Sequence, residues 1–304
     1  MAKKKQPAFE ESIIVDEAAS LPETLPELPE EILEAPPITL AQRAGGGVRG
    51  CGYKKDPVDP RDFPALKLLG APRNLPLEAS LESLVRRVRD QLSSSSCVGQ
   101  STSSAAEIRL DKMGIKHENV SAIGTYKIAR TWGRSLEKEP LEDEGAFIRQ
   151  AFKGIRETGL IPERVAPFLL DTINDELTWD ELQAASTYRV KEWYRISDYG
   201  TGKTEGICSA IAQGYPVVFG IDVDRAFQDH YGSGVLKAPG KNRIGGHAMC
   251  LVGYRTVNGS RQYRGLNSWG TSWGDKGFYW CDESFILDVS MGDACVMQIG
   301  PKGA

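Results

Sequence analysis

The sequence has few histidines, no long apolar run and a small net charge. Its three histidines stand at positions 117, 230 and 247, so any site that needs an imidazole has few candidates. No stretch approaches the roughly 20 consecutive apolar residues of a membrane span, and a net charge of −4 supplies no basic field for nucleic acid. We therefore expect a protein with neither a membrane nor a nucleic acid as its partner.

Cysteine pairs at metal-binding spacing are also missing. The six cysteines include no C-x-x-C pair, and a chain of 304 residues can bury a core without disulfide bonds. We expect neither a zinc site nor a disulfide framework, and no metal or cofactor. The first residues, MAKKKQPAFEE, turn acidic where a signal peptide needs an apolar run, so a reducing, cytoplasmic location is expected.

Residues 1–50 differ in composition from the rest. Between Gln6 and Gln42 there are nine acidic residues, six prolines and no basic residue, a composition that cannot bury enough apolar surface to fold alone. The apolar clusters ESIIVDE and EEILEAPPITL could still dock on a partner surface, and three glycines at 45–47 form a hinge. The predicted organisation is an N-terminal arm at 1–50 and a globular domain at 51–304.

The globular domain changes from helical to strand patterns along the chain. Helices are predicted at 96–114 and 143–160, where each pattern ends at a glycine. After about residue 187, short segments rich in β-branched and aromatic residues alternate with glycine or asparagine turns. These predicted strands lie at 187–196, 215–223, 246–255, 262–269 and 277–282. A helical half followed by a sheet-rich half predicts an α+β fold.

His247 is the histidine whose surroundings suggest chemistry. It follows two glycines in GGHAMCLVGY, and residues without side chains let a substrate or another backbone approach the ring. Asn267 could fix its tautomer and ring orientation, and Trp269 could shield that hydrogen bond from water. The alternatives are a core histidine at the start of a strand and a turn asparagine among aromatic residues. His117 and His230 are expected at the surface.

Cys97 stands at the predicted start of a helix, in QLSSSSCVGQ. Unpaired N–H groups and the helix dipole at that end stabilise a thiolate, and a nearby imidazolium would add to the effect. Gln91 could place a side-chain N–H beside the Cys97 backbone N–H, and two such donors form an oxyanion hole. Taken alone, the stretch could equally be a serine linker with an incidental thiol. Glutamine, cysteine, histidine and asparagine together supply every group that nucleophilic catalysis needs.

Three motifs resemble papain-like cysteine peptidases. VRDQLSSSSCVGQS is similar to the nucleophile segment of that family, GGHAMCLVGY to its histidine strand, and LNSWGTSWGDKGFYW to its signature N-S-W-G-x-x-W-G-x-x-G-[FY]. The resemblance covers roughly residues 50–300. The stretches at 52–66, 74–91 and 143–163 also resemble bacterial and phage-type members.

The resemblance implies a fold and a set of site residues. A helical lobe at roughly 75–185 and a β-barrel-like lobe at roughly 186–300 would form a papain-like two-lobe fold, with the substrate cleft between them. The implied catalytic residues are Cys97 as nucleophile, His247 as general base and acid, Asn267 as the residue that orients His247, and Gln91 as oxyanion-hole donor. The residues implied to lie near the cleft are Glu144, Gly145, Ala146 and Gly246.

The sequence departs from the family around the nucleophile. Ser94 stands where relatives commonly have a disulfide-forming cysteine, which agrees with a reducing compartment. Val98 replaces the aromatic residue that usually follows the nucleophile. Four serines take the place of a glycine-containing turn, in the segment expected to carry the oxyanion-hole donor.

The leading hypothesis is a cysteine endopeptidase that acts on a peptide or protein substrate. The same four groups could serve an exopeptidase or an amidase. The alternative is a papain-fold binding or structural protein of a larger assembly, which the acidic arm favours and the complete set of four groups opposes. A Cys-His-His cell-wall amidase is disfavoured, because the third member here is an asparagine.

The arm leads to one further hypothesis. Residues 1–50 would lie across the cleft as the proregion of a zymogen, and cleavage near residues 45–49 would release activity. Its apolar clusters, followed by a glycine hinge between Arg43 and Arg49, motivate the idea. A solvated tail or a tether to a partner is the alternative.

Overall fold

The computed structural model describes residues 50–57, 59, 62–70, 74–134, 140–196 and 200–302. The chain divides into two units, Met1–Gly45 and Gly46–Ala304, and the described residues belong to the second. Apart from Gly50, the arm at 1–50 lies outside the described residues. Its docking and its cleavage therefore stay predictions.

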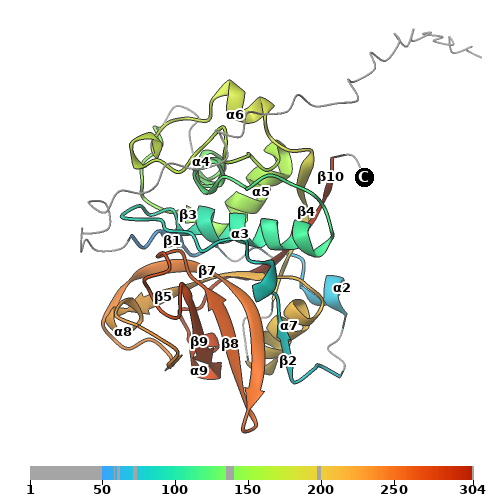
Figure 1. Cartoon of the computed structure of the whole chain (residues 1–304), viewed down its shortest axis with the longest axis vertical. Coiled ribbons are helices and arrows are strands. Elements are labelled where there is room, and N and C mark those ends of the chain that lie inside the picture. The colour runs from blue at the N-terminus through green and yellow to red at the C-terminus, as the bar shows by residue number, and fades with distance from the viewer. Residues whose placement is uncertain are drawn as a thin grey trace, which may run out of the picture. The chain divides into compact units, whose positions relative to one another are not determined.

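The first half of the described chain is helical. Helices α3 (Cys97–Lys112), α4 (Ala122–Gly133) and α5 (Ile148–Thr158) pack against one another and lie above the large sheet in Figure 1. Small side chains let α3 be buried from Cys97 to Leu110. At Gly99 the approach is so close that a Cβ would lie 2.4 Å from the carbonyl oxygen of Ala122.

Local signals set the ends of these helices. The Ser121 hydroxyl accepts a hydrogen bond from the Gly124 N–H at 2.8 Å and caps α4. A capping box precedes α6 (Trp179–Gln183). The helix predicted at 96–114 is confirmed. The one predicted at 143–160 begins only at Ile148, because Gly145 has a φ of +89° and the next two residues form a strand.

The second half is built on an eight-stranded sheet. Its order is β4-β10-β5-β7-β8-β9-β6, with β2 paired to β7, and the pairs are antiparallel except for β6 with β9. The strands are β2 (Glu78–Ser80), β4 (Tyr188–Arg195), β5 (Val217–Asp224), β6 (Val235–Leu236), β7 (Arg243–Val257), β8 (Ser260–Leu266), β9 (Phe278–Asp282) and β10 (Ala294–Pro301). All five predicted strands are confirmed, while β10 was not predicted.

Shorter elements complete the described chain. Strand β1 (Tyr53–Lys54) pairs in parallel with β3 (Ala146–Phe147), apart from the large sheet. The remaining helices are α2 (Leu66–Leu69), α7 (Gly200–Ala212), α8 (Arg225–Gln228) and α9 (Glu283–Ile286), with 3-10 turns at Glu82–Leu84 and Leu170–Thr172. The sequence patterns did not predict α7, whose glycines and small residues give no clear apolar stripe.

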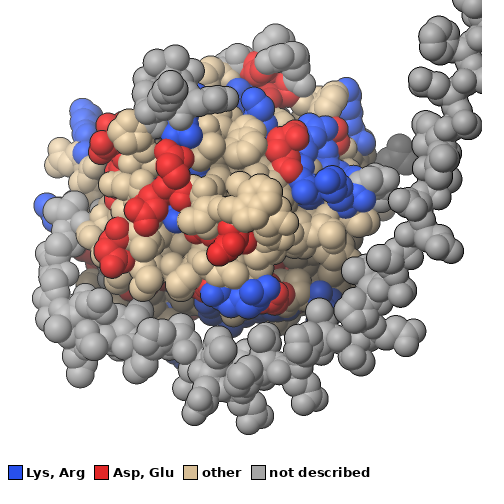
Figure 2. Space-filling view, turned by 90° about the horizontal axis from the view of Figure 1, so that it is seen from above, with Lys and Arg blue, Asp and Glu red and all other residues tan. Residues whose placement is uncertain are grey.

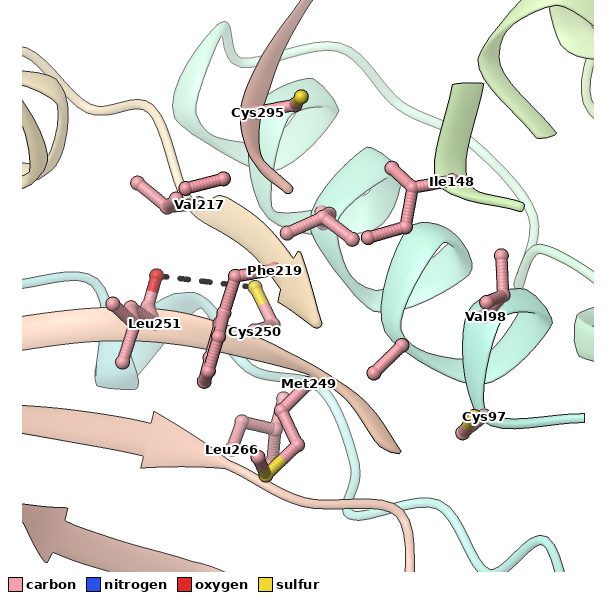
Figure 3. Close-up of a cluster of buried hydrophobic side chains, with 14 of the residues drawn as sticks. Cys97, Val98, Ile148, Val217, Phe219, Met249, Cys250, Leu251, Leu266 and Cys295 are labelled. Carbon is pink, nitrogen blue, oxygen red and sulfur yellow. Dashed lines mark hydrogen bonds between the residues drawn. The ribbon is translucent and has the colours of Figure 1, made fainter. Parts of the chain in front are cut away.

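The core joins the helices to the sheet. In Figure 3, Cys97 and Val98 lie at the start of α3, across from Phe219 of β5 and Met249 of β7. Both cysteine and valine are fully buried there. The predicted α+β fold is confirmed, and its catalytic candidates lie where the two halves meet.

Two features of the described residues concern binding to membranes and to charged ligands. No helix within the described ranges is long and apolar enough to cross a membrane. Figure 2, which looks down on the helical side, shows acidic and basic side chains interspersed over that face. That face therefore offers no field of a single sign to a charged ligand.

Candidate active site

Cys97 is the first residue of α3, the helix that packs against β7. Its thiol is completely buried, and burial raises its pKa to about 11. The backbone N–H groups of Ala248, Gly52 and Val98 lie near the sulfur and oppose that rise in pKa. These donors and the helix start prepare the sulfur for negative charge, while burial keeps it a neutral thiol in this structure.

His247 lies on β7, opposite Ile221 of β5. Its Nε2 is 2.7 Å from Asn267 Oδ1, and that oxygen also accepts from the Ser268 backbone N–H at 2.8 Å. Because Oδ1 is an acceptor, Nε2 carries the proton and Nδ1 is the basic nitrogen. No described residue forms a hydrogen bond with Nδ1. Burial lowers the pKa of His247 to about 4, and the Asn267 bond partly opposes this.

The predicted triad residues are close in space. Ala248, whose N–H lies near the Cys97 sulfur, directly follows His247. Trp269 stacks on the His247 ring with centroids 4.7 Å apart, and both side chains are fully buried. Phe227 packs edge-on against both rings. These rings pack against the His247 side chain, and the shielding of the His247–Asn267 hydrogen bond by Trp269 stays a prediction.

Gln91 stands six residues before Cys97 and is fully buried. Its Nε2 donates to the Gly50 carbonyl at 2.9 Å and to the Ser94 carbonyl at 2.8 Å. Its Oε1 accepts from the Ser268 hydroxyl at 2.7 Å, so the amide has a fixed orientation. The Ser94 hydroxyl donates back to the Gln91 carbonyl at 2.7 Å. A hydrogen bond thus holds the turn at the position where a disulfide is common in relatives.

Residues Gly50–Asp56, which we call the covering segment, run over this group of side chains. The Gly50 carbonyl takes the Gln91 donor, and the Gly52 N–H reaches the Cys97 sulfur. The Gly52 carbonyl then accepts from the Ala146 N–H at 2.8 Å, which begins the β1–β3 pairing. The covering segment therefore contacts both Gln91, the expected oxyanion-hole donor, and Cys97, the expected nucleophile.

The four residues expected near a substrate cleft all meet the covering segment. Glu144 forms an ion pair with Lys54 at 3.6 Å, and Ala146 pairs with Tyr53. A Cβ on Gly145 would lie 2.0 Å from the Gly52 oxygen, and one on Gly246 would lie 2.5 Å from the Tyr53 oxygen. The expectation that the four bind substrate stays a prediction, but they lie together along one stretch of backbone.

The other two histidines are half-buried, although we expected them at the surface. His117 Nδ1 is 2.7 Å from the Glu118 carbonyl oxygen, and Nε2 is 3.3 Å from an Asp111 carboxylate oxygen. His230 packs on Trp273 with ring centroids 5.7 Å apart. Burial lowers the pKa of His230.

The sequence patterns missed the covering segment and the groups that hold it. The Tyr53 hydroxyl donates to Asp293 Oδ2 at 2.7 Å, and the Asp56 N–H donates to the same oxygen at 2.8 Å. Arg195 Nη1 donates to Asp293 Oδ1 at 2.5 Å. The glycines at 50 and 52 were the available signal, because neither position has room for a side chain beside the serine turn.

Comparison with known protein families assigns the chain to one of them. Residues 78–297 match the model described as papain family cysteine protease. The chain belongs to the papain family of cysteine proteases. The match begins after the covering segment, so the family domain carries all four catalytic candidates and the covering segment precedes it.

Individual relatives agree with this assignment. An uncharacterized peptidase C1-like protein of Acanthamoeba polyphaga mimivirus is 28% identical over 172 residues, which is 52% of this chain and 53% of that protein. Cathepsin S of Rattus norvegicus is 29% identical over 136 residues, covering 44% of this chain and 39% of that protein. The chain thus spans about half the length, or less, of these curated relatives.

Solved structures are similar over more of the chain. Xylellain, a cysteine protease from Xylella fastidiosa, has a TM-score of 0.69 at 25% identity and covers 82% of this chain and 96% of its own. A digestive procathepsin L 3 of Tenebrio molitor has a TM-score of 0.64 at 20% identity, covering 82% of this chain and 75% of its own. The papain-like fold predicted from the motifs is confirmed.

Proposed function

We propose that this protein is a cysteine endopeptidase folded in a latent state. The observation that carries the proposal is the hydrogen bond of His247 Nε2 to Asn267, which leaves Nδ1 as the base on the residue next to Ala248, whose backbone N–H acts on the buried Cys97 sulfur. Ser268, the residue after Asn267, links this group to Gln91. Its substrates are peptides or proteins, as in the family to which it belongs. The paired backbone of β1 and β3 supports an extended peptide as the natural occupant of the site.

The chemistry follows from the position of each group. His247 Nδ1 takes the proton of the Cys97 thiol, and the thiolate attacks the peptide carbonyl carbon. Gln91 Nε2 and the Cys97 backbone N–H stabilise the oxyanion of the tetrahedral intermediate. The imidazolium then protonates the leaving amine, and water, deprotonated by the same nitrogen, hydrolyses the thioester. Asn267 holds the ring orientation through both steps.

The covering segment accounts for the latent state. It engages Gln91 and Cys97 through backbone groups, so a substrate would reach neither residue until the segment leaves. The likeness to procathepsins supports a zymogen. Cleavage near residues 45–49, as the sequence suggested, would leave Gly50–Asp56 attached. We therefore place the activating cut after Asp56 and before residue 78, where the family match begins.

A binding or structural protein remains the second candidate, because a permanently covered site would have no activity. The full chain carrying Gly52→Val distinguishes the two. A Cβ at Gly52 would lie 1.9 Å from the Ser95 carbonyl oxygen, and Asp143 holds the Ser95 backbone N–H. Valine should therefore displace the covering segment rather than the turn.

The readouts are casein hydrolysis and the rate at which iodoacetamide labels Cys97, followed by peptide mass spectrometry. We expect Gly52→Val to raise both, and Cys97→Ala in the same background to abolish hydrolysis. Gly234→Ala is the matched control, since its Cβ would meet only an ordinary 3.5 Å contact with His230. If Cys97 of a folded Gly52→Val protein reacts no faster than the other thiols, and His247→Ala leaves that rate unchanged, the enzyme hypothesis is wrong.

A further inference from the structure

Tyr53 of the covering segment fills a pocket that three glycines open. A Cβ on Gly220 of β5 would lie 2.1 Å from the ring carbon that bears the hydroxyl, and one on Gly292 would lie 2.5 Å from the hydroxyl oxygen. A Cβ on Gly246 would be 3.2 Å from the near edge of the ring. Any side chain at the first two positions would exclude the phenol. The space is therefore shaped for a ring with a para substituent.

The end of this pocket is polar and built for a hydroxyl group. The Tyr53 hydroxyl donates to Asp293 Oδ2 at 2.7 Å and accepts from the Asp293 backbone N–H at 3.1 Å. One oxygen thus both donates and accepts, which an ammonium or guanidinium group cannot do. The Asp293 side chain is completely buried, so its hydrogen-bond demand is not met by bulk water.

The Asp293 carboxylate already has a cation partner. Arg195 Nη1 donates to the other oxygen of Asp293 at 2.5 Å. The same Nη1 also lies 4.0 Å from an Asp62 carboxylate oxygen, so the preference for a phenol rests on the two hydrogen bonds of the hydroxyl group and not on a balance of charge. A neutral donor such as the tyrosine hydroxyl satisfies Oδ2 without adding charge.

The pocket adjoins the reacting groups. Gly246 directly precedes His247, and Gly220 precedes Ile221, which pairs with His247 across the β5–β7 ladder. In the covering segment, Gly52 directly precedes Tyr53, and the Gly52 N–H lies at the Cys97 sulfur. A side chain in this pocket therefore belongs to a residue next to the one held at the nucleophile, which is where specificity for a peptide substrate is set.

We propose that the pocket now filled by Tyr53 is the specificity pocket of the active enzyme, and that it selects tyrosine through the Asp293 carboxylate and backbone N–H. This inference rests on the proposed peptidase function. The covering segment then acts as a mimic of the preferred substrate side chain. The enzyme would cleave peptides one residue away from a tyrosine. It would discriminate against phenylalanine, which leaves the Asp293 backbone N–H without its acceptor and removes one of the donors to Asp293 Oδ2.

The test uses the full chain with Gly52→Val and Tyr53→Ala, which frees the site and empties the pocket. Fluorescence-quenched peptide substrates are compared by kcat/KM. They differ at one position, which is Tyr, Phe, Leu or Arg, and mass spectrometry identifies the cleavage sites. Tyrosine should exceed phenylalanine by about tenfold or more, since a site built around a hydroxyl penalises its loss. Cleavage of casein with no preference for tyrosine would overturn the inference and leave the peptidase proposal standing.

Two further experiments test the assignment of the pocket. Gly292→Ala, with its Cβ where the hydroxyl oxygen lies, should reverse the preference in favour of phenylalanine, while Gly234→Ala should not alter it. In the Cys97→Ala form of the opened chain, the peptide GSGYKKD should bind about tenfold more tightly than GSGFKKD in calorimetry. Equal binding of the two peptides would overturn the pocket assignment whether or not the protein has peptidase activity.

Discussion

The backbone N–H of Gly52 lies close enough to the sulfur of Cys97 to lower the pKa of the thiol. This contact places a residue that precedes the family domain against the nucleophile of that domain. It also buries the sulfur, and burial is the main reason that the pKa of Cys97 rises to about 11. Under the proposed function, covering the site would block substrate and disfavour the thiolate at the same time.

Tyr53→Phe should loosen the covering segment without changing any group of the site. The variant removes the hydrogen bond from the hydroxyl to Asp293 Oδ2, and a buried bond to a charged group contributes about 1.5–3 kcal/mol. The labelling rate of Cys97 with iodoacetamide in the full chain should rise at least about tenfold. Tyr231→Phe is the control, because that side chain is 73% exposed. Equal rates for the two variants would mean that Tyr53 does not hold the segment.

The docking of the covering segment should weaken as pH rises. Burial, followed by the neighbouring charge of Asp293, raises the pKa of Asp56 from 3.8 to about 7. A carboxyl whose pKa is raised in the docked state favours docking fully below pH 3.8, and that contribution is lost as pH rises through 7. The charged groups that face Asp56 are Asp293, Arg149 and Arg195, and the two arginines limit the rise.

The comparison with Asp56→Asn isolates this effect. An asparagine oxygen can still accept from the Arg149 backbone N–H, as Asp56 Oδ2 does at 3.0 Å, but it does not titrate. The ratio of Cys97 labelling rates, wild type over Asp56→Asn, should increase between pH 5 and pH 8. A constant ratio over that range would show that another group controls release. Taking the ratio cancels the ionisation of the Cys97 thiol itself.

Gln91→Ala should impair turnover more than it impairs nucleophile reactivity. In the opened Gly52→Val chain, its Nε2 is the donor that the Gly50 carbonyl now occupies. Removing one oxyanion donor costs about 10²–10³ in kcat, whereas alkylation of Cys97 forms no oxyanion. Gln100→Ala is the matched control, since it removes another buried glutamine that contacts the same turn. If both variants lower kcat equally, Gln91 acts only through the fold.

Some of this site was accessible from sequence and some was not. The Cys97 and His247 motifs and the N-S-W-G signature lie in continuous stretches, so local patterns were enough to propose Cys97, His247 and Asn267, whose catalytic roles stay predictions. The β1–β3 pairing joins two residues to two others that are 93 positions away, and strands this short have no periodicity to detect. The same holds for the pocket around Tyr53, because its glycines at 220, 246 and 292 come together only through the sheet.

The predicted helix at 143–160 illustrates a second kind of limit. Its apolar stripe was identified correctly, and Phe152 and Ile155 are fully buried. Its beginning was wrong because Gly145 adopts a positive φ that puts the next two residues beside the covering segment. Helical propensity carried no information about that partner, which decides the local structure.

His247 should make the folded state depend on pH below neutrality. Burial lowers its pKa from 6.5 to about 4, so the folded chain holds a neutral ring while the unfolded chain takes up a proton. The resulting stability is fully present above pH 6.5 and is lost as pH falls through 4, with a total of about 3 kcal/mol. Urea unfolding at pH 7.0 and 4.5 should show a smaller decrease for His247→Gln than for wild type. An equal decrease in wild type and His247→Gln would contradict a neutral buried His247.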